Sequence, residues 1–220
     1  KSNAQEKASE KSSEREKEFS DKEYEIHYDK KNKALENILG KMHNMVGHAI
    51  IPFDVGGAVD MYYFPNSQHG MCFATMELID PDGSGPKPNR QGLTYELIAF
   101  TKLKFNEKKD TAFSKIERRI CGIFTAIGNY SYQVVLNPKD TCEIPGSGNG
   151  ESNKCLIFDE LSIKGKPFVI GKKPHTLLIL IEVFRSEMEF ARRNGTDELI
   201  KQLKVKGYYP YSDLDREPVI

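Results

Sequence analysis

The last third of the chain combines one very apolar run with two amphipathic segments. Residues Thr176 to Phe184 (TLLILIEVF) are apolar on both faces, which is typical of a strand buried inside a sheet. Segments 186–193 and 196–204 repeat apolar residues at helical spacing, and Gly195 between them indicates a helix end. We therefore predict a buried strand followed by two short helices.

A second apolar segment, Leu93 to Phe105, alternates so that both of its faces are largely apolar. Such a strand must be covered on each side, and we expect helices to cover it. The next helix is predicted to have Asp110 as its N-cap and to end at Gly128-Asn129. Its buried residues are expected to be Phe113, Ile116, Ile120, Phe124 and Ile127.

The first half of the chain adds a helical pattern and a pair of strands. From Asn32 to Gly47, one helical face carries Leu35, Ile38, Leu39, Met42, Met45 and Val46. Runs 59–64 and 71–78 alternate as strands and are expected to pair. Weaker strand patterns occur at 132–136, 155–158 and 167–170, and loops are predicted at 80–91 and 145–153.

Strands and helices are mixed in this pattern without a regular alternation. That arrangement predicts an α+β fold, with a mixed, mostly antiparallel central sheet flanked by helices in a single domain. Residues 1–22 are rich in Ser, Glu and Lys, with Phe19 as their one large apolar residue. They are predicted to form a disordered or loosely helical charged arm, and residues 23–220 the folded domain.

Composition narrows the class of protein. Of 220 residues, 38% are apolar, and the 32 basic residues balance 32 acidic ones, so no global charge favours nucleic acid or an anionic membrane. No apolar run approaches the roughly 18 residues of a membrane span.

The four cysteines form no CxxC pair and are expected to be reduced, in a cytoplasmic protein. Cys142 and Cys155 would pair only under oxidising conditions. The chain begins at Lys1, which leaves open whether a signal segment preceded it.

Motifs for metals and cofactors are incomplete. The glycine-rich loop 146–150 follows Pro145 and leads into polar residues, whereas a dinucleotide fingerprint joins a strand to a helix. The acidic loop 80–84 lacks the closing Glu of a calcium loop, and His69 with Cys72 has no second pair to complete a zinc site. We therefore predict no metal and no cofactor. A rival hypothesis is a hydrolase or transferase that uses His175, Glu182 or Asp215.

The C-terminal tail offers a different kind of chemistry. Tyr208, Tyr209 and Tyr211 follow Gly207 and provide large amphipathic side chains with little conformational entropy to lose. With Asp213 and Arg216 they are the residues that we predict to bind a partner protein. The alternative is that the tyrosines pack on the domain and that an ion pair anchors the tail.

Several of these segments together resemble the Suppressor of fused family. The resemblance lies in the order of GHAIIP at 47–52, GLTYEL at 92–97, the strand and two helices at 176–203, and DLDREPV at 213–219. It covers about residues 34–219. Ile98-Ala99-Phe100 departs from the family pattern, in which an aromatic or basic residue follows Glu-Leu.

The resemblance implies a domain that binds another protein and has no enzymatic activity. Eukaryotic members of that family restrain a transcription factor and carry a further C-terminal domain, which we expect this chain to lack. Short bacterial members resemble immunity proteins that neutralise polymorphic toxins, which makes a toxin domain the expected partner. A peptide-binding module that acts by strand addition is a further alternative, and it predicts a long unpaired edge strand beside a groove.

Overall fold

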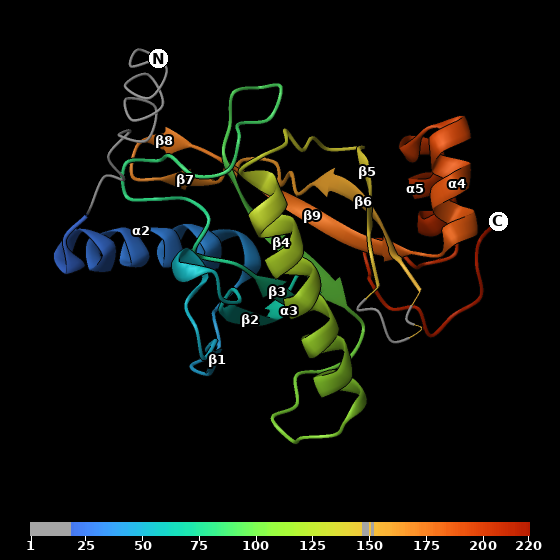
Figure 1. The fold of residues 1–220 in the computed structure, drawn as a ribbon, viewed down its shortest axis with the longest axis horizontal. Helices are drawn as coiled ribbons and strands as arrows, with labels where there is room; N and C mark the ends of the chain where they lie inside the picture. Colours follow the sequence, from blue (N-terminus) through green and yellow to red (C-terminus); the bar gives the residue numbers. More distant parts are fainter. Residues whose placement is uncertain (1–18, 147–149, 151) are drawn as a thin grey trace, which may run out of the picture.

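A seven-stranded mixed sheet forms the centre of the molecule in the part of the chain that the structure describes, residues 19–146, 150 and 152–220 (Figure 1). In this computed structural model the strand order is β1-β2-β3-β4-β9-β6-β5. The strands are β1 Val46–Gly47, β2 Met61–Ser67, β3 Gly70–Ala74, β4 Tyr95–Thr101, β5 Thr141–Ile144, β6 Lys154–Glu160 and β9 Thr176–Val183, with a separate hairpin of β7 Val169–Ile170 and β8 Lys173–Pro174. The helices are α2 Asp21–Leu39, the 3-10 turn η2 Phe53–Val55, α3 Ala112–Ser131, α4 Arg185–Asn194 and α5 Thr196–Val205.

Strand β9 lies in the middle of the sheet. It pairs in parallel with β4, from Tyr95 opposite Thr176, and antiparallel with β6. Every other neighbouring pair in the sheet is antiparallel. The predicted α+β fold with a mostly antiparallel sheet is therefore confirmed, as are the buried strand at 176–184 and the two helices that follow it.

Both faces of the sheet are covered. Alternate residues of β4 and β9 enter two separate cores, because successive side chains of a strand point to opposite faces. One core joins the sheet to α2, α4 and α5, and the other joins it to α3 and η2. Figure 1 shows α3 crossing the sheet and the α4–α5 pair at one end of the molecule. All seven residues of β4 are buried, as predicted for a strand with two apolar faces.

Helix α2 begins and ends earlier than the sequence pattern predicted. Ser20 and Glu23 form a capping box at its start, and Gly40, at φ 87°, ends it. The prediction of a helix from Asn32 to Gly47 was wrong at both ends, because His27 and Lys31 on its buried face hid the first turns and Gly40 stops it. Residues 1–18 of the predicted arm lie outside the described residues.

A buried ion pair fastens α2 to the sheet. Lys31 Nζ lies 2.7 Å from Glu96 Oε1 on β4 and donates to the carbonyl oxygens of Met76 and Ile79, both at 2.7 Å. Glu96 in turn accepts hydrogen bonds from Thr75 Oγ1 at 2.7 Å and from the Ile79 amide at 3.1 Å. The pair therefore satisfies backbone groups of the irregular segment 75–79 inside the protein.

Other predicted bounds need correction. Thr111, rather than Asp110, caps α3, and the helix continues past Gly128 to Ser131. Residues 132–136 form no strand, whereas the short strands β1, β5 and β8 were not predicted. All four cysteines are free thiols. Among the described residues, no helix has the length and apolar character needed to cross a bilayer.

Candidate functional site

The C-terminal tail lies against the C-terminal halves of strands β4 and β9. The Ser212 amide donates to the carbonyl of Phe100 at 2.9 Å, and the Ser212 hydroxyl donates to the carbonyl of Leu180 at 3.1 Å. Tyr211 forms a parallel bridge with Phe100. The tail thereby lies in the gap where β4 and β9 separate, and it is part of the folded domain.

Arg216 and Asp213 hold the tail in place. Arg216 makes a two-pronged ion pair with Glu187 of α4, at 2.6 and 2.8 Å, and the two side chains are 4% and 0% exposed. Asp213 accepts hydrogen bonds from Thr101 Oγ1 at 2.6 Å and from the Lys102 amide at 2.9 Å. These contacts correspond to the alternative in which an ion pair anchors the tail, and they leave Arg216 little surface for a partner.

The three tail tyrosines are half-buried and retain exposed area. The Lys102 ammonium lies 4.8 Å from the ring centre of Tyr208 and 5.2 Å from that of Tyr211. Tyr209 donates its hydroxyl to Asp159 at 2.9 Å, and burial raises its pKa above the usual value. We call the exposed parts of these three rings the tail surface. The structure brings the predicted residues together, with Tyr208 also 4.9 Å from the Arg216 guanidinium.

Three exposed aliphatic side chains gather on the segment between β1 and β2. Ile50, Ile51 and Val55 are 101%, 57% and 69% exposed, and we call these three side chains the apolar loop. They were missed because the segment 47–52 was interpreted only as a turn. The sequence did contain an indication of this surface, because turns are usually built from polar residues, glycine and proline. Two adjacent isoleucines beside Pro52 and Gly56-Gly57 are therefore unusual.

The apolar loop is held rigidly by its own backbone and by Phe53. The amides of Val55 and Gly57 donate to the Pro52 carbonyl, at 3.3 and 2.8 Å. A side chain at Gly57 would collide with the Ile51 carbonyl, so glycine is required for this closure. Phe53 is buried against α3, where Gly128 leaves room for its ring. The loop therefore presents its apolar side chains from a backbone that hydrogen bonds hold between Pro52 and Gly57.

Acidic side chains lie near Tyr24, and one of them, Asp54, is next to the apolar loop. Tyr24 of α2 is half-exposed, and its pKa is raised by burial and by the negative charges of Asp80, Asp54 and Asp82. Asp54 itself is part of η2. An apolar centre with Asp54 beside it favours a partner surface that is apolar in the middle and has a basic residue at its edge.

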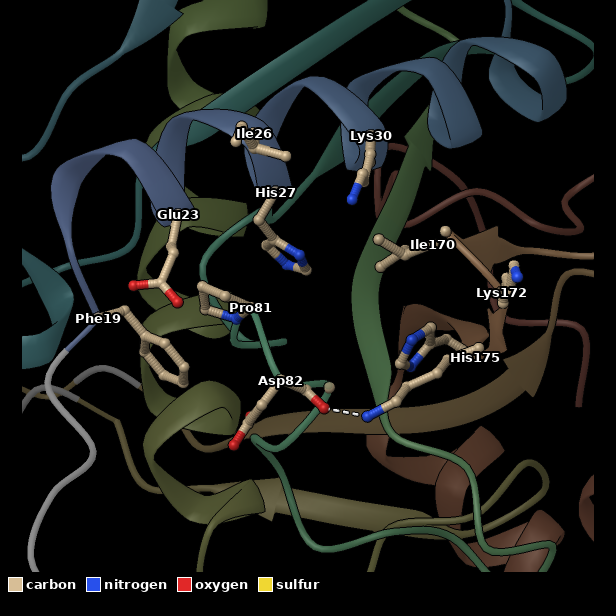
Figure 2. A pocket seen from close by; sticks show the side chains of 13 residues that line it. Phe19, Glu23, Ile26, His27, Lys30, Pro81, Asp82, Ile170, Lys172 and His175 are labelled. Atoms are coloured by element: carbon tan, nitrogen blue, oxygen red, sulfur yellow. Dashed lines mark hydrogen bonds between the residues drawn. The ribbon is translucent and has the colours of Figure 1, made fainter.

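The three residues of the enzyme hypothesis lie in different places. His175 lines a cavity of about 510 Å³ between α2 and the β7–β8 hairpin, as Figure 2 shows. The Glu182 carboxylate is paired with Arg119 of α3. Asp215 is exposed and borders a separate hollow beside α3. The described residues also contain no group of three or more His, Cys, Asp or Glu side chains arranged to hold a metal ion.

In the described part of the chain, both edge strands of the sheet are short. Strand β1 has two residues and β5 has four, so the long free edge expected for strand addition is not present there. However, β5 does border a groove of about 720 Å³ whose opposite wall comes from the last turns of α3 and the segment 134–136.

Comparisons with known proteins identify a shared fold. No family model and no curated protein matches the sequence. Among solved structures, a chain described as "the Sufu-Fu complex crystal structure" matches with a TM-score of 0.54 and 15% identity, covering 89% of this chain and 91% of that chain. This likeness confirms the expected relation in fold to Suppressor of fused, and at this identity it shows the fold alone.

Proposed function

We propose that this chain is a non-catalytic, cytoplasmic protein-binding domain, and specifically a bacterial immunity protein that neutralises a polymorphic toxin by covering it. The observation that carries the proposal is the apolar loop, in which Ile50, Ile51 and Val55 are exposed on a rigid backbone. These side chains add little to folding, since they remain in water. The likeness to a chain from a complex of two proteins supports the same function.

The energetics define how large the interface must be. Burying three aliphatic side chains is favourable by about 1.5–3 kcal/mol each. A nanomolar complex requires about 12 kcal/mol in net terms, after an association cost of at least about 4 kcal/mol. The apolar loop therefore supplies the centre of the interface but not all of it. An interface of about 1,600 Å² would extend beyond these three side chains, over Asp54 and Tyr24.

The tail surface is the second candidate for partner contact. Of the five residues predicted to bind a partner, Tyr208, Tyr209 and Tyr211 offer exposed area for contact, whereas Asp213 and Arg216 would act by holding them in place. Figure 1 shows η2 and the red C-terminal tail toward opposite ends of the molecule. The two surfaces can therefore be tested separately.

The test is co-expression with each toxin domain encoded beside the gene. A one-to-one complex is expected by size-exclusion chromatography with light scattering. The double variant Ile51→Asp, Val55→Asp should weaken it by about 100-fold or more, because charges would enter the apolar centre. Val205→Asp is the matched control, since Val205 is 81% exposed on α5, and it should bind as the wild type does.

Two results would reject parts of the proposal. If no neighbouring toxin domain forms a complex, the immunity function is wrong. If a complex forms and the apolar-loop variant binds normally, the interface is elsewhere, and Tyr208→Ala with Tyr211→Ala then tests the tail surface.

A peptide-binding function is the alternative that the groove beside β5 favours. An extended peptide could pair with the edge of Thr141–Ile144 and place its side chains in the groove. Peptides selected on the immobilised protein would then slow hydrogen exchange at the β5 amides. Binding without such protection would exclude strand addition.

A further inference from the structure

The cavity in Figure 2 has the composition of a small-molecule site. It lies between the first turns of α2, the loop at Pro81–Gly83 and the β7–β8 hairpin, and its volume is about 510 Å³. Ligand cavities of this size are common in proteins, at roughly 300–1,000 Å³. Lys173 of the hairpin donates to the Asp82 carbonyl and so connects two of the walls.

Two buried histidines point into this cavity and use one ring nitrogen each for the fold. His27 Nε2 lies 2.8 Å from the carbonyl of Ile79, which only accepts, so Nε2 carries the proton. His175 Nδ1 lies 2.8 Å from Thr94 Oγ1. We assign the Thr94 hydrogen to the Gly83 carbonyl, 3.3 Å away, and this assignment places the ring proton on Nδ1. Within the described residues, the second nitrogen of each ring has no hydrogen-bond partner.

The histidines therefore present hydrogen-bond acceptors to the cavity. Burial and the nearby Lys31 charge lower the pKa of both rings, so both are neutral at pH 7. In a neutral imidazole with one nitrogen protonated, the other nitrogen accepts. A ligand that donates through hydroxyl groups would satisfy His27 Nδ1 and His175 Nε2.

The cavity also has positive charge available for an anion. Lys30 and Lys172 are among its lining residues, and neither ammonium group has an ion-pair or hydrogen-bond partner in the described part of the chain. The two carboxylates in the lining are already engaged. Glu23 accepts from the Ser20 amide and hydroxyl in the α2 capping box, and Asp82 accepts from the amide and hydroxyl of Ser84.

We propose that this cavity binds a phosphorylated sugar, alone or as part of a mononucleotide. Lys30 and Lys172 would bind the phosphate, and the free nitrogens of His27 and His175 would accept hydrogen bonds from sugar hydroxyls. Ile26, Pro81 and Ile170 supply an apolar wall for the carbon skeleton. This binding is proposed separately from the protein partner and involves no residue of the apolar loop or the tail surface.

Isothermal titration calorimetry of the whole chain tests this inference. Ribose 5-phosphate and adenosine 5′-monophosphate are the probes, with inorganic phosphate and ribose as comparisons. At least one of the two sugar phosphates should bind about tenfold more tightly than inorganic phosphate, because only the sugar reaches the imidazoles. The two probes distinguish a site for the sugar phosphate alone from one that also accepts a base.

Charge variants then locate the binding. Lys30→Glu with Lys172→Glu should reduce the affinity at least about tenfold, and both residues are exposed, so folding should be retained. Lys33→Glu is the matched control, since Lys33 is exposed on the same helix outside the cavity, and it should bind normally. The inference is wrong if neither sugar phosphate binds at about 5 mM. It is also wrong if phosphate alone binds equally well, or if the control loses as much affinity as the double variant.

Discussion

Replacing Lys31 with alanine is expected to destabilise the fold by about 3–5 kcal/mol, the usual cost of removing one partner of a buried ion pair. The Lys31 side chain is 1% exposed and its ammonium donates three hydrogen bonds at 2.7 Å, to Glu96, Met76 and Ile79. The alanine variant would leave a buried carboxylate without its counter-charge and two carbonyl oxygens without this donor.

Hydrophobic replacement of both partners should not restore this stability. In some proteins a buried ion pair can be exchanged for apolar side chains at little cost. Here Glu96 also accepts from Thr75 Oγ1 and from the Ile79 amide, so the variant Lys31→Met, Glu96→Leu would leave those donors unsatisfied. We therefore expect the double variant to remain destabilised relative to the wild type.

Urea unfolding followed by circular dichroism measures the change, and a thermal scan provides a second reading. For a chain of this size, about 1 kcal/mol shifts the melting temperature by about 2–4 °C, so Lys31→Ala should lower it by about 6–20 °C. Lys33→Ala, an exposed change on the same helix, should stay within about 0.5 kcal/mol of the wild type. A loss below about 1 kcal/mol in Lys31→Ala would refute the reasoning.

Two further changes test the tail and the cavity. Arg216→Ala should cost about 3–5 kcal/mol in urea unfolding because Glu187 stays buried and unpaired, whereas the exposed Arg193→Ala should be near neutral; equal effects would contradict this. Burial and the Lys31 charge lower the pKa of His175 from 6.5 to about 4. The unfolded chain therefore binds a proton at His175 near pH 6.5, whereas the folded chain does so only near pH 4. Acidification from pH 6.5 to pH 4 should therefore lower the free energy of unfolding of the wild type. The loss should be on the order of 3 kcal/mol greater than in the variant His175→Gln. The same pH dependence in both proteins would show that His175 does not contribute.

Local periodicity predicted those elements whose buried side chains are apolar. Strand β9 and helices α4 and α5 were placed to within one or two residues, because an unbroken apolar run and glycine-separated helical repeats have few other interpretations. The start of α2 was missed for the opposite reason. Its buried face carries His27 and Lys31, and polar residues there become core residues only through partners about 45 to 65 positions away.

The candidate binding surfaces, too, could be predicted from the sequence only in part. The tail tyrosines could be found from composition, but the sequence left open whether Arg216 faces a partner or Glu187, and only the folded structure shows the ion pair. The apolar loop and the cavity could not be placed from the sequence, because exposure and convergence depend on tertiary contacts. His27 and His175 are 148 residues apart and meet only because α2 packs beside the β7–β8 hairpin.

One backbone carbonyl connects the stability of α2 to the geometry of the cavity. The Ile79 carbonyl accepts from both Lys31 Nζ and His27 Nε2, and it lies immediately before the loop that supplies Pro81 and Asp82 to the cavity. Losing the lysine should therefore let His27 and this loop shift, and Lys31→Ala should lower sugar-phosphate affinity at temperatures where it is still folded. Binding at the apolar loop should be unchanged in the same variant, because that loop is held by Pro52 and Phe53. Calorimetry with ribose 5-phosphate and with the toxin domain separates the two effects, and an unchanged sugar-phosphate affinity would show that Ile79 does not link them.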